Sequence, residues 1–518
     1  MGPLTAFLGR AFRLLFGARN GRRLVVLLFG MWMVVSWQRQ FTRPDAHIDK
    51  TYRVWAATGL NKPWEAQFFF FLYHLGIYPL KTDAPILKDT RNEAERLLRA
   101  APEKLKQDEW VTFRSGDRGR VYLFYFDKIV NGASAINPTL KPAHIFAWRL
   151  ALCALWFAAW WSRRPWLGAA LVIALGSNPF QLNVVYNDEN VFGWSITAMV
   201  LVLAIHLPLM GTAPEGGYRR RLSVAYPWIA AFGTAILMAT IRNVRSEPMV
   251  VMGGAVFVYL TLSRTSWVKR ALLVIALVTT FSLTTRAYAY QIHRKFEQAQ
   301  KVLVDLGQEP YTGPYRAYHE FWHALYCGLG DFDTKYGYEW NDLKVYRFVY
   351  PSLQRWHPEL EINPNRAPQS FTYDKAKKYP VYYGEIDERY HDLVKAKVLG
   401  DIKNDPRWYA DIIKQRIWRI LTETTPVTIA YGDLDLQTKS PLFGLLAVPL
   451  LGFLAWTRRW FYARLLLFSA PLAAPALIIY SDRGMANYSC IHIFSAVIMT
   501  AVFATGLREW AARRRARA

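Results

Sequence analysis

About ten apolar runs, each bounded by polar or charged sequence, dominate this chain of 518 residues. A helix rises about 1.5 Å per residue, so roughly 20 residues are needed to cross the hydrocarbon core of a membrane. The runs cover residues 24–37, 143–161, 165–182, 191–210, 225–241, 248–262, 271–285, 441–456, 465–480 and 491–507. The shorter runs reach the required length with flanking aromatic or hydroxyl residues. We therefore expect an all-α polytopic membrane protein with about ten transmembrane helices.

Basic residues are concentrated in alternate loops between these runs. Short loops rich in Lys and Arg remain on the cytoplasmic side of a membrane. The pattern predicts that both termini are cytoplasmic and that two large regions, 38–142 and 287–440, lie on the opposite face. The basic loop residues include Arg163, Arg164, Arg219, Arg220, Arg221, Lys269, Arg270, Arg458, Arg459, Arg464, Arg513, Arg514 and Arg515.

The formal net charge of +25 comes mostly from these loops. Residues dispersed over separate loops do not form the continuous groove or stripe that binds phosphates of nucleic acid. The charge therefore indicates topology, and we expect no nucleic-acid partner.

Five segments follow from the spans and their orientation. The first outer region includes an aromatic stretch, 64–79, that is too short to span and suits the membrane interface. The segments are 1–37, the cytoplasmic N-terminus and first transmembrane helix; 38–142, the first extracytoplasmic loop with interfacial helices; 143–286, a six-helix transmembrane region; 287–440, a mostly helical extracytoplasmic domain; and 441–518, three transmembrane helices with a basic cytoplasmic tail.

The extracytoplasmic domain is expected to begin with a helix near 291–306 and to end with an amphipathic helix over 406–422. Lys414, Arg416 and Arg419 lie beside the apolar stripe of the second helix. The stripe consists of Trp408, Ile412, Ile413, Ile417, Trp418, Ile420 and Leu421. Such a helix lies on the membrane surface or packs against its own domain.

Four acidic residues lie close to the expected outer face of the membrane. Asp45 and Asp49 follow the first span, and Asp188 and Glu189 lie in the short loop between the third and fourth spans. A carboxylate in such a place can take a proton from an acceptor hydroxyl or hold a divalent metal ion. These four residues are therefore candidate catalytic groups, although Asp188 and Glu189 also suit the cap of the following helix.

Four arginines lie on the same face, where the positive-inside pattern does not account for them. They are Arg242, Arg245, Arg286 and Arg483. A guanidinium group binds phosphate through two parallel hydrogen bonds, so these side chains suit the phosphate of a lipid carrier. Ion pairs with the neighbouring Glu247 and Asp482 are the alternative.

This layout resembles the glycosyltransferase superfamily C, which includes protein O-mannosyltransferases and oligosaccharyltransferases. In that superfamily a first span leads to a long outer loop, a seven-span core follows, and a variable region completes the chain; residues 1–290 fit this plan. The resemblance implies transfer of a sugar from a polyprenyl phosphate, with Asp45 or Asp49 as the base and Asp188 with Glu189 as a second acidic motif. The adjacent Asp-Glu pair usual in the first loop is replaced here by two separated acids.

The second outer region contains the sequence His-Glu-Phe-Trp-His at 319–323, which satisfies the H-E-x-x-H pattern of zinc peptidases. Histidines four residues apart on a helix can bind one zinc ion. The neighbouring aromatic and acidic residues also suit a carbohydrate, because rings stack on sugars and carboxylates accept hydrogen bonds from hydroxyls. Ordinary packing is a third alternative. The candidate acceptor-binding residues are His319, Trp322, His323, Tyr326 and Asp331.

The three cysteines, Cys153, Cys327 and Cys490, are spread over a membrane run, the second outer region and the margin of the last run. This distribution does not indicate a disulfide framework. We expect free thiols.

The expected function is transfer of a sugar from a polyprenyl-phosphate donor to an acceptor glycan, lipid or protein on the extracytoplasmic face. The alternatives are a membrane zinc metallopeptidase that uses His319 and His323, and a transporter or non-catalytic glycan-assembly protein. The sequence calls for no cofactor beyond an optional divalent cation, Mg²⁺ or Mn²⁺, at Asp188 and Glu189. The composition suggests a bacterial inner membrane, with the large regions in the periplasm; a lumenal face of the endoplasmic reticulum would satisfy the same charge rule.

Overall fold

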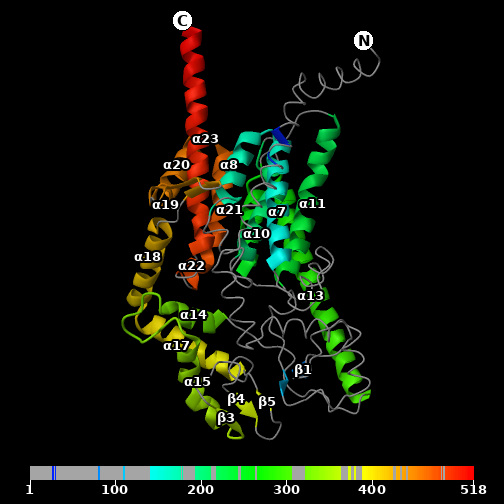
Figure 1. Cartoon of the computed structure of the whole chain (residues 1–518), viewed down its shortest axis with the longest axis vertical. Coiled ribbons are helices and arrows are strands. Elements are labelled where there is room, and N and C mark those ends of the chain that lie inside the picture. Colours follow the sequence, from blue (N-terminus) through cyan, green and yellow to red (C-terminus); the bar gives the residue numbers. More distant parts are fainter. Residues whose placement is uncertain are drawn as a thin grey trace.

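The computed structural model describes residues 141–176, 178, 193–211, 217–242, 247–262, 265–305, 321–362, 372–374, 379–380, 388–423, 427–431, 434–438, 441–479, 481 and 485–517, with 26–27, 30, 80–81 and 109–110. Helices dominate these residues (Figure 1). They form an apolar bundle and, at one end of it, a smaller helical domain. The expected helical fold is confirmed at this level.

Nine apolar helices of the described part occupy the positions of nine predicted runs. Among the described residues, four segments are long and apolar enough to cross a membrane: Val224–Arg242, Trp267–Gln291, Trp460–Ile478 and Asn487–Leu507. The helices are α7 (Lys141–Trp161), α8 (Pro165–Gly176), α10 (Gly193–Met210), α11 (Gly217–Arg242), α12 (Val251–Leu260), α13 (Trp267–Asp305), α20 (Ala447–Trp456), α21 (Trp460–Ser469) and α23 (Met485–Arg517). Short helical pieces flank them: η4 (Glu247–Val250), α19 (Leu442–Leu445), η6 (Ala470–Ala473) and α22 (Ala474–Ile478).

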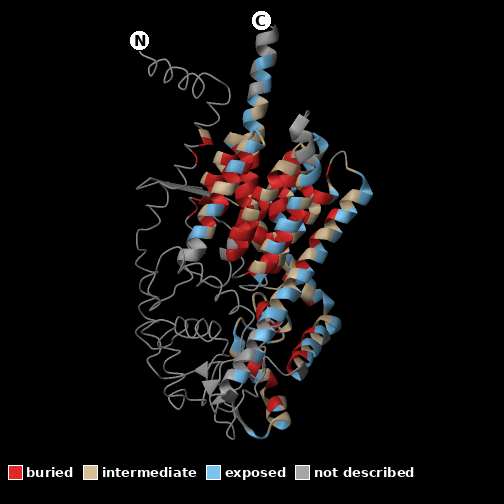
Figure 2. Ribbon diagram, turned by 90° about the vertical axis from the view of Figure 1, so that its right-hand side faces the viewer, coloured by how far each residue is buried: buried red, intermediate tan, exposed pale blue. Residues whose placement is uncertain are grey.

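The bundle is packed around α10, which contacts α7, α11, α12, α21 and α23. Buried residues are concentrated in its interior (Figure 2). Large apolar side chains are exposed on its outer face, among them Ile229 on α11 and Ile275 on α13, with 59% and 57% of their surface accessible. Exposed apolar side chains of this kind suit lipid, because they form no hydrogen bonds with water.

The arginine at position 464 fixes one end of the bundle. Its Nη1 donates a hydrogen bond to the Met210 carbonyl at 2.8 Å, and its other terminal nitrogen donates to the Thr261 carbonyl. Met210 ends α10 and Thr261 follows α12, so both carbonyls carry the partial negative charge of a helix C-terminus. Arg464 thereby joins the ends of α10 and α12 to α21.

Further contacts bring other basic turns to the same end. The Arg164 guanidinium lies 3.8 Å from the centre of the Phe461 ring. Arg270 donates a hydrogen bond to the Leu260 carbonyl at 2.9 Å. Arg459 Nη2 lies 4.0 Å from a Glu509 carboxylate oxygen. The turns after α7, α12 and α20 and the last turns of α23 therefore share one end of the bundle, as the alternation of basic loops predicts. The helical domain lies at the other end (Figure 1).

Helix α13 continues beyond the bundle at the end where the helical domain lies (Figure 1). The sequence predicts a span over 271–285 and a separate helix near 291–306, with a segment boundary after residue 286. The structure joins them in one helix of 39 residues. No Gly or Pro interrupts residues 267–305, so the backbone has no local reason to stop at the membrane boundary.

The helical domain is built from α14 (Phe321–Leu329), α15 (Asp342–Trp356), α17 (Glu388–Asn404) and α18 (Pro406–Thr422). Its core includes Tyr346, Leu353, Tyr390 and Val394, each almost fully buried. The strands of the described part are short and antiparallel. One sheet contains β3 (Leu360–Ile362), β4 (Thr372–Asp374) and β5 (Tyr379–Pro380), and β1 (Leu80–Lys81) pairs with β2 (Glu109–Trp110). The hairpin of β6 (Val427–Tyr431) and β7 (Leu434–Thr438) contacts α8 and α23 of the bundle.

Helix α18 connects the two parts of the molecule. Asp405 caps it by accepting a hydrogen bond from the Trp408 amide at 3.1 Å, and Pro406 occupies the first turn. Its first half contributes Ile412 to the domain core, and its last turn contributes Ile420 to a second core with Ala476 and Tyr488. The helix therefore packs against its own domain and against the bundle end (Figure 1).

Candidate functional site

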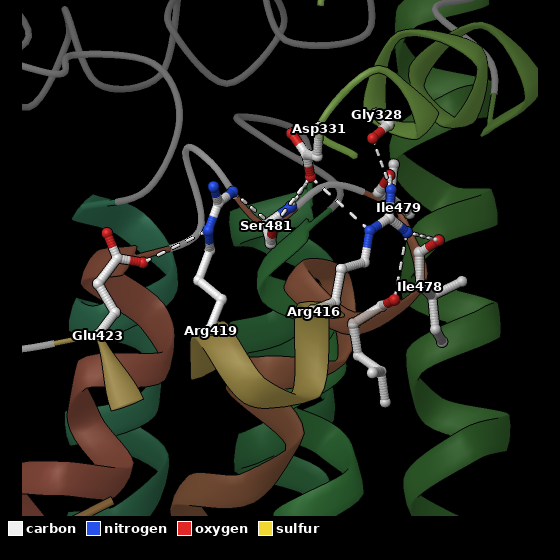
Figure 3. Close-up of polar contacts among 9 residues, drawn as sticks. Gly328, Asp331, Arg416, Arg419, Glu423, Ile478, Ile479 and Ser481 are labelled. Atoms are coloured by element: carbon white, nitrogen blue, oxygen red, sulfur yellow. Dashed lines mark hydrogen bonds and ion pairs between the residues drawn. The ribbon is translucent and has the colours of Figure 1, made fainter. Parts of the chain in front are cut away.

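The junction between domain and bundle centres on Arg416, whose side chain is fully buried. Its guanidinium donates to the carbonyls of Gly328 at 2.6 Å, Ile478 at 2.9 Å and Ile479 at 2.9 Å (Figure 3). A further hydrogen bond reaches the Leu477 carbonyl at 3.2 Å. These carbonyls lie at the C-terminal ends of α14 and α22, where helix geometry leaves carbonyls without intrahelical donors. One side chain thus ties together three segments distant in sequence.

Asp331 lies beside this arginine, with its carboxylate 3.7 Å from Arg416 Nε. Its Oδ2 accepts hydrogen bonds from the Ser481 amide at 2.5 Å and the Ser481 hydroxyl at 3.0 Å. The Asp331 Oδ1 and Arg416 Nε atoms are buried and have no hydrogen-bond partner among the described residues. Burial lowers the pKa of the Arg416 guanidinium, and the negative charge of Asp331 opposes that effect.

A chain of polar contacts extends the junction toward the start of α23 (Figure 3). Arg419 donates to the Ser481 hydroxyl at 2.9 Å, and its Nε lies 3.9 Å from the Glu423 carboxylate. The Tyr488 hydroxyl donates to the same carboxylate. Arg419 also lies 4.4 Å from the centre of the Phe332 ring. These contacts fix the position of the domain at the bundle end.

A second polar cluster lies on the buried face of α14. His323, with 1% of its surface accessible, places Nδ1 2.5 Å from the Tyr390 hydroxyl and Nε2 3.2 Å from Asp342 Oδ1. The Cys327 thiol donates to the same carboxylate oxygen at 3.6 Å. Burial, and then the neighbouring Asp342 carboxylate, raise the pKa of this thiol. An unassisted nucleophilic role for Cys327 is therefore disfavoured, whereas the donor set of nitrogen, sulfur and oxygen can hold a metal ion.

No protein-family model, curated protein or solved structure matches the chain.

Two of the four predicted phosphate-binding arginines are described. Arg242 ends α11, is exposed, and lies 5.8 Å from the Phe281 ring of α13. Arg286 is exposed on α13, near a hydrogen bond of 3.0 Å that links Thr240 of α11 to Tyr288. Arg242 therefore lies at the seam between α11 and α13, and both arginines lie near the end of the bundle at which the helical domain is found. Arg245 and Arg483 lie outside the described residues.

The predicted catalytic acids Asp45, Asp49, Asp188 and Glu189 lie outside the described residues, and so does His319. Their roles stay predictions. The interfacial stretch at 64–79 is likewise outside this part of the chain.

The other predicted acceptor-binding residues lie in or near the domain core. Tyr326 packs edge-on against Tyr338, with ring centres 4.6 Å apart, and has 5% of its surface accessible. The Asp331 side chain is fully buried, and Trp322 is partly exposed. The contacts that the structure shows are packing and junction contacts, while binding of an acceptor stays a prediction.

The sequence predicts Arg416 on the polar edge of its helix, and this prediction is wrong because the side chain is buried. The buried face of α18 consists of Trp408, Ile412, Arg416 and Ile420, spaced four residues apart. Ile417 and Trp418, which the apolar stripe included, are exposed, with 45% and 63% of their surface accessible. The sequence signal for this burial is the four-residue spacing of Arg416 from Ile412 and Ile420, which places all three on one face of the helix. An arginine on a buried face needs a buried partner for its charge.

Proposed function

We propose that the chain is an integral membrane glycosyltransferase that moves a sugar from a polyprenyl-phosphate donor to an acceptor glycan, lipid or protein. The observation that carries this proposal is a helical domain joined through Arg416 to one end of an apolar bundle whose opposite end bears the basic turns. The positive-inside rule assigns the basic end to the cytoplasm and the domain to the extracytoplasmic face. The full chain would then cross the membrane about ten times, with both termini inside.

A lipid-linked donor suits this arrangement because its polyprenyl chain lies in the bilayer while its sugar phosphate lies at the surface. Arg242 and Arg286 are exposed near the domain end of the bundle and can approach such a phosphate. The acceptor oxygen would attack the anomeric carbon as the bond to the phosphate oxygen breaks. A carboxylate from Asp45, Asp49, Asp188 or Glu189 would take the hydroxyl proton, and the arginines would stabilise the departing phosphate.

The test is turnover of radiolabelled polyprenyl-phosphate sugars by purified protein in lipid nanodiscs. We expect Asp45→Asn or Asp49→Asn, and Asp188→Asn, to reduce turnover by at least 100-fold, because general-base catalysis contributes about 10² to 10⁴ in rate. Asp411→Asn removes an exposed carboxylate of α18 and serves as the matched control. No turnover of any carrier by the wild type, with zinc found at one equivalent per chain, would favour the metallopeptidase alternative instead.

A further inference from the structure

We propose that His323, Cys327 and Asp342 form a binding site for a soft divalent metal ion, and that zinc is its ligand. This site differs from the histidine pair of the H-E-x-x-H pattern, because its sulfur and oxygen ligands come from other turns and another helix. The inference does not depend on the glycosyltransferase proposal.

Regular secondary structure places each of the three ligands. His323 and Cys327 are four residues apart on α14, so they project from the same face of that helix. Asp342 begins α15, whose first turn is fixed by Asn341 accepting a hydrogen bond from the Leu343 amide at 3.0 Å. The ligand set therefore rests on two packed helices rather than on a loose loop.

Two of the three distances between donor atoms match those of a tetrahedral zinc site. Zinc binds nitrogen and oxygen at about 2.0 to 2.2 Å and sulfur at about 2.3 Å, so neighbouring ligand atoms are about 3.3 to 3.6 Å apart. His323 Nε2 lies 3.2 Å from Asp342 Oδ1, and Cys327 Sγ lies 3.6 Å from that oxygen. All three atoms lie within 4.8 Å of one another. A small movement of the thiol and imidazole toward each other is enough to bring all three donor atoms within bonding distance of one ion.

The chemistry of the donors selects the class of metal. Mg²⁺ and Ca²⁺ prefer oxygen ligands, whereas imidazole and thiolate favour Zn²⁺. His323 and Cys327 are buried, while the Asp342 side chain is 57% exposed. Three protein ligands leave a fourth tetrahedral position, which would be open to water on the side of Asp342. Binding would convert the Cys327 thiol to a thiolate and release its proton to solvent.

Tyr390 provides the outer contact that orients the histidine. Its hydroxyl lies 2.5 Å from His323 Nδ1, and its side chain is fully buried on α17. With Nε2 on the metal, Nδ1 carries the proton and donates it in a hydrogen bond to the hydroxyl, which fixes the tautomer and the ring orientation. The ion would thus link α14 and α15 directly and engage α17 through Tyr390.

Without a metal ion, the same groups can hydrogen-bond to one another. Tyr390 would then donate to Nδ1, and the protonated Nε2 would donate to Asp342. The experiment must therefore measure metal directly, rather than infer it from the stability of the cluster.

The experiment uses the full chain, purified without a histidine tag, loaded with Zn²⁺ and then dialysed. Mass spectrometry of the elements should find one zinc per protein chain. Cobalt substitution should produce the intense ultraviolet absorption of a thiolate bound to Co²⁺.

Cys327→Ser and Asp342→Asn should each weaken zinc binding at least tenfold, and Cys327→Ser should abolish the thiolate band. Cys153→Ser, which removes a free cysteine on α7, is the matched control and should leave zinc content unchanged.

Asp342→Asn keeps the experiment informative if Cys327→Ser does not fold, because the Asp342 side chain is largely exposed. Zinc should also raise the melting temperature of the wild type but not of Asp342→Asn. The proposal is overturned if the dialysed wild type retains no zinc, or if its zinc content and cobalt spectrum are the same in all three variants.

Discussion

Two buried arginines illustrate how single residues organise this protein. Arg464 binds carbonyls at the ends of α10 and α12, and Arg416 binds those at the ends of α14 and α22. In both cases a cation that is costly to bury is placed against the negative ends of helices. Such partners are contributed by segments far away in sequence, so the type of residue can be recognised from the sequence but its partners cannot.

Replacing Arg416 should be strongly destabilising. Arg416→Met removes the hydrogen bonds to helix ends and leaves the buried Asp331 carboxylate without its cation, which should cost about 3 to 5 kcal/mol. Thermal unfolding in detergent measures the effect. Arg407→Met, at an exposed position of the same helix, should change stability by less than about 0.5 kcal/mol. Addition of Asp331→Asn to Arg416→Met should restore part of the loss, and equal effects of the two arginine variants would refute this account of the junction.

Asp333 should make the helical domain sensitive to acid. Burial by itself raises its pKa, but hydrogen bonds from the amides of Lys335, Tyr336 and Tyr338 and from the Trp408 indole outweigh burial and lower the pKa. A lowered folded-state pKa contributes stability above the unfolded value of about 3.9, and that contribution is lost as pH falls through the folded value.

Asp333→Asn tests this pH dependence. We expect it to reduce stability at pH 7 by about 1 to 2 kcal/mol, since charge-assisted hydrogen bonds are weakened. It should also flatten the dependence of melting temperature on pH below about 4. Asp411→Asn, at an exposed site, should leave the profile unchanged, and an acid profile identical in wild type and Asp333→Asn would exclude Asp333 as the cause.

At the scale of elements, α18 is the helix that couples the domain to the bundle. Local signals predicted its bounds, because Asp405 and Pro406 mark the start and the Thr-Thr-Pro sequence at 424–426 follows its end. The sequence did not predict the continuity of α13, since a change from apolar to polar residues marks a change of solvent and not the end of a helix. The periodicity of apolar residues predicts where helices form. It is a poorer guide to which face of a helix packs against which other element.

Three isoleucines on α18 allow a test of this coupling. Ile412→Ala and Ile420→Ala should each cost about 2 to 4 kcal/mol, because both side chains are buried, one in the domain core and one at the bundle end. Ile417→Ala, at a position with 45% of its surface accessible, is the matched control and should cost less than about 1 kcal/mol. Proteolysis of the domain should increase in the Ile420 variant; an unchanged cleavage rate would show that the bundle contact does not hold the domain.

The whole molecule has two chemically different ends. Positions of the apolar runs and basic loops could be predicted from the sequence, because the membrane imposes length and charge rules on each span. The junction could not, since Arg416, Gly328 and Ile478 become neighbours only in the folded chain.

The two ends should lie on opposite sides of the membrane. Single cysteines introduced at the exposed positions Lys403 in α17 and Arg458 after α20 should react with a membrane-impermeant maleimide from opposite faces. The background is the variant in which Cys153, Cys327 and Cys490 are replaced by serine. Labelling of both positions in intact cells would contradict the proposed orientation.

Transfer of a sugar from a polyprenyl phosphate by the purified chain is the most direct test of the proposed function. The account predicts that free polyprenyl phosphate and glycosylated acceptor form in equal amounts. It also predicts that Arg242→Gln with Arg286→Gln lowers the rate without changing the melting temperature, because both side chains are exposed. If folded wild-type protein in lipid releases no polyprenyl phosphate from any donor in the presence of glycan, lipid and peptide acceptors, the glycosyltransferase proposal is contradicted.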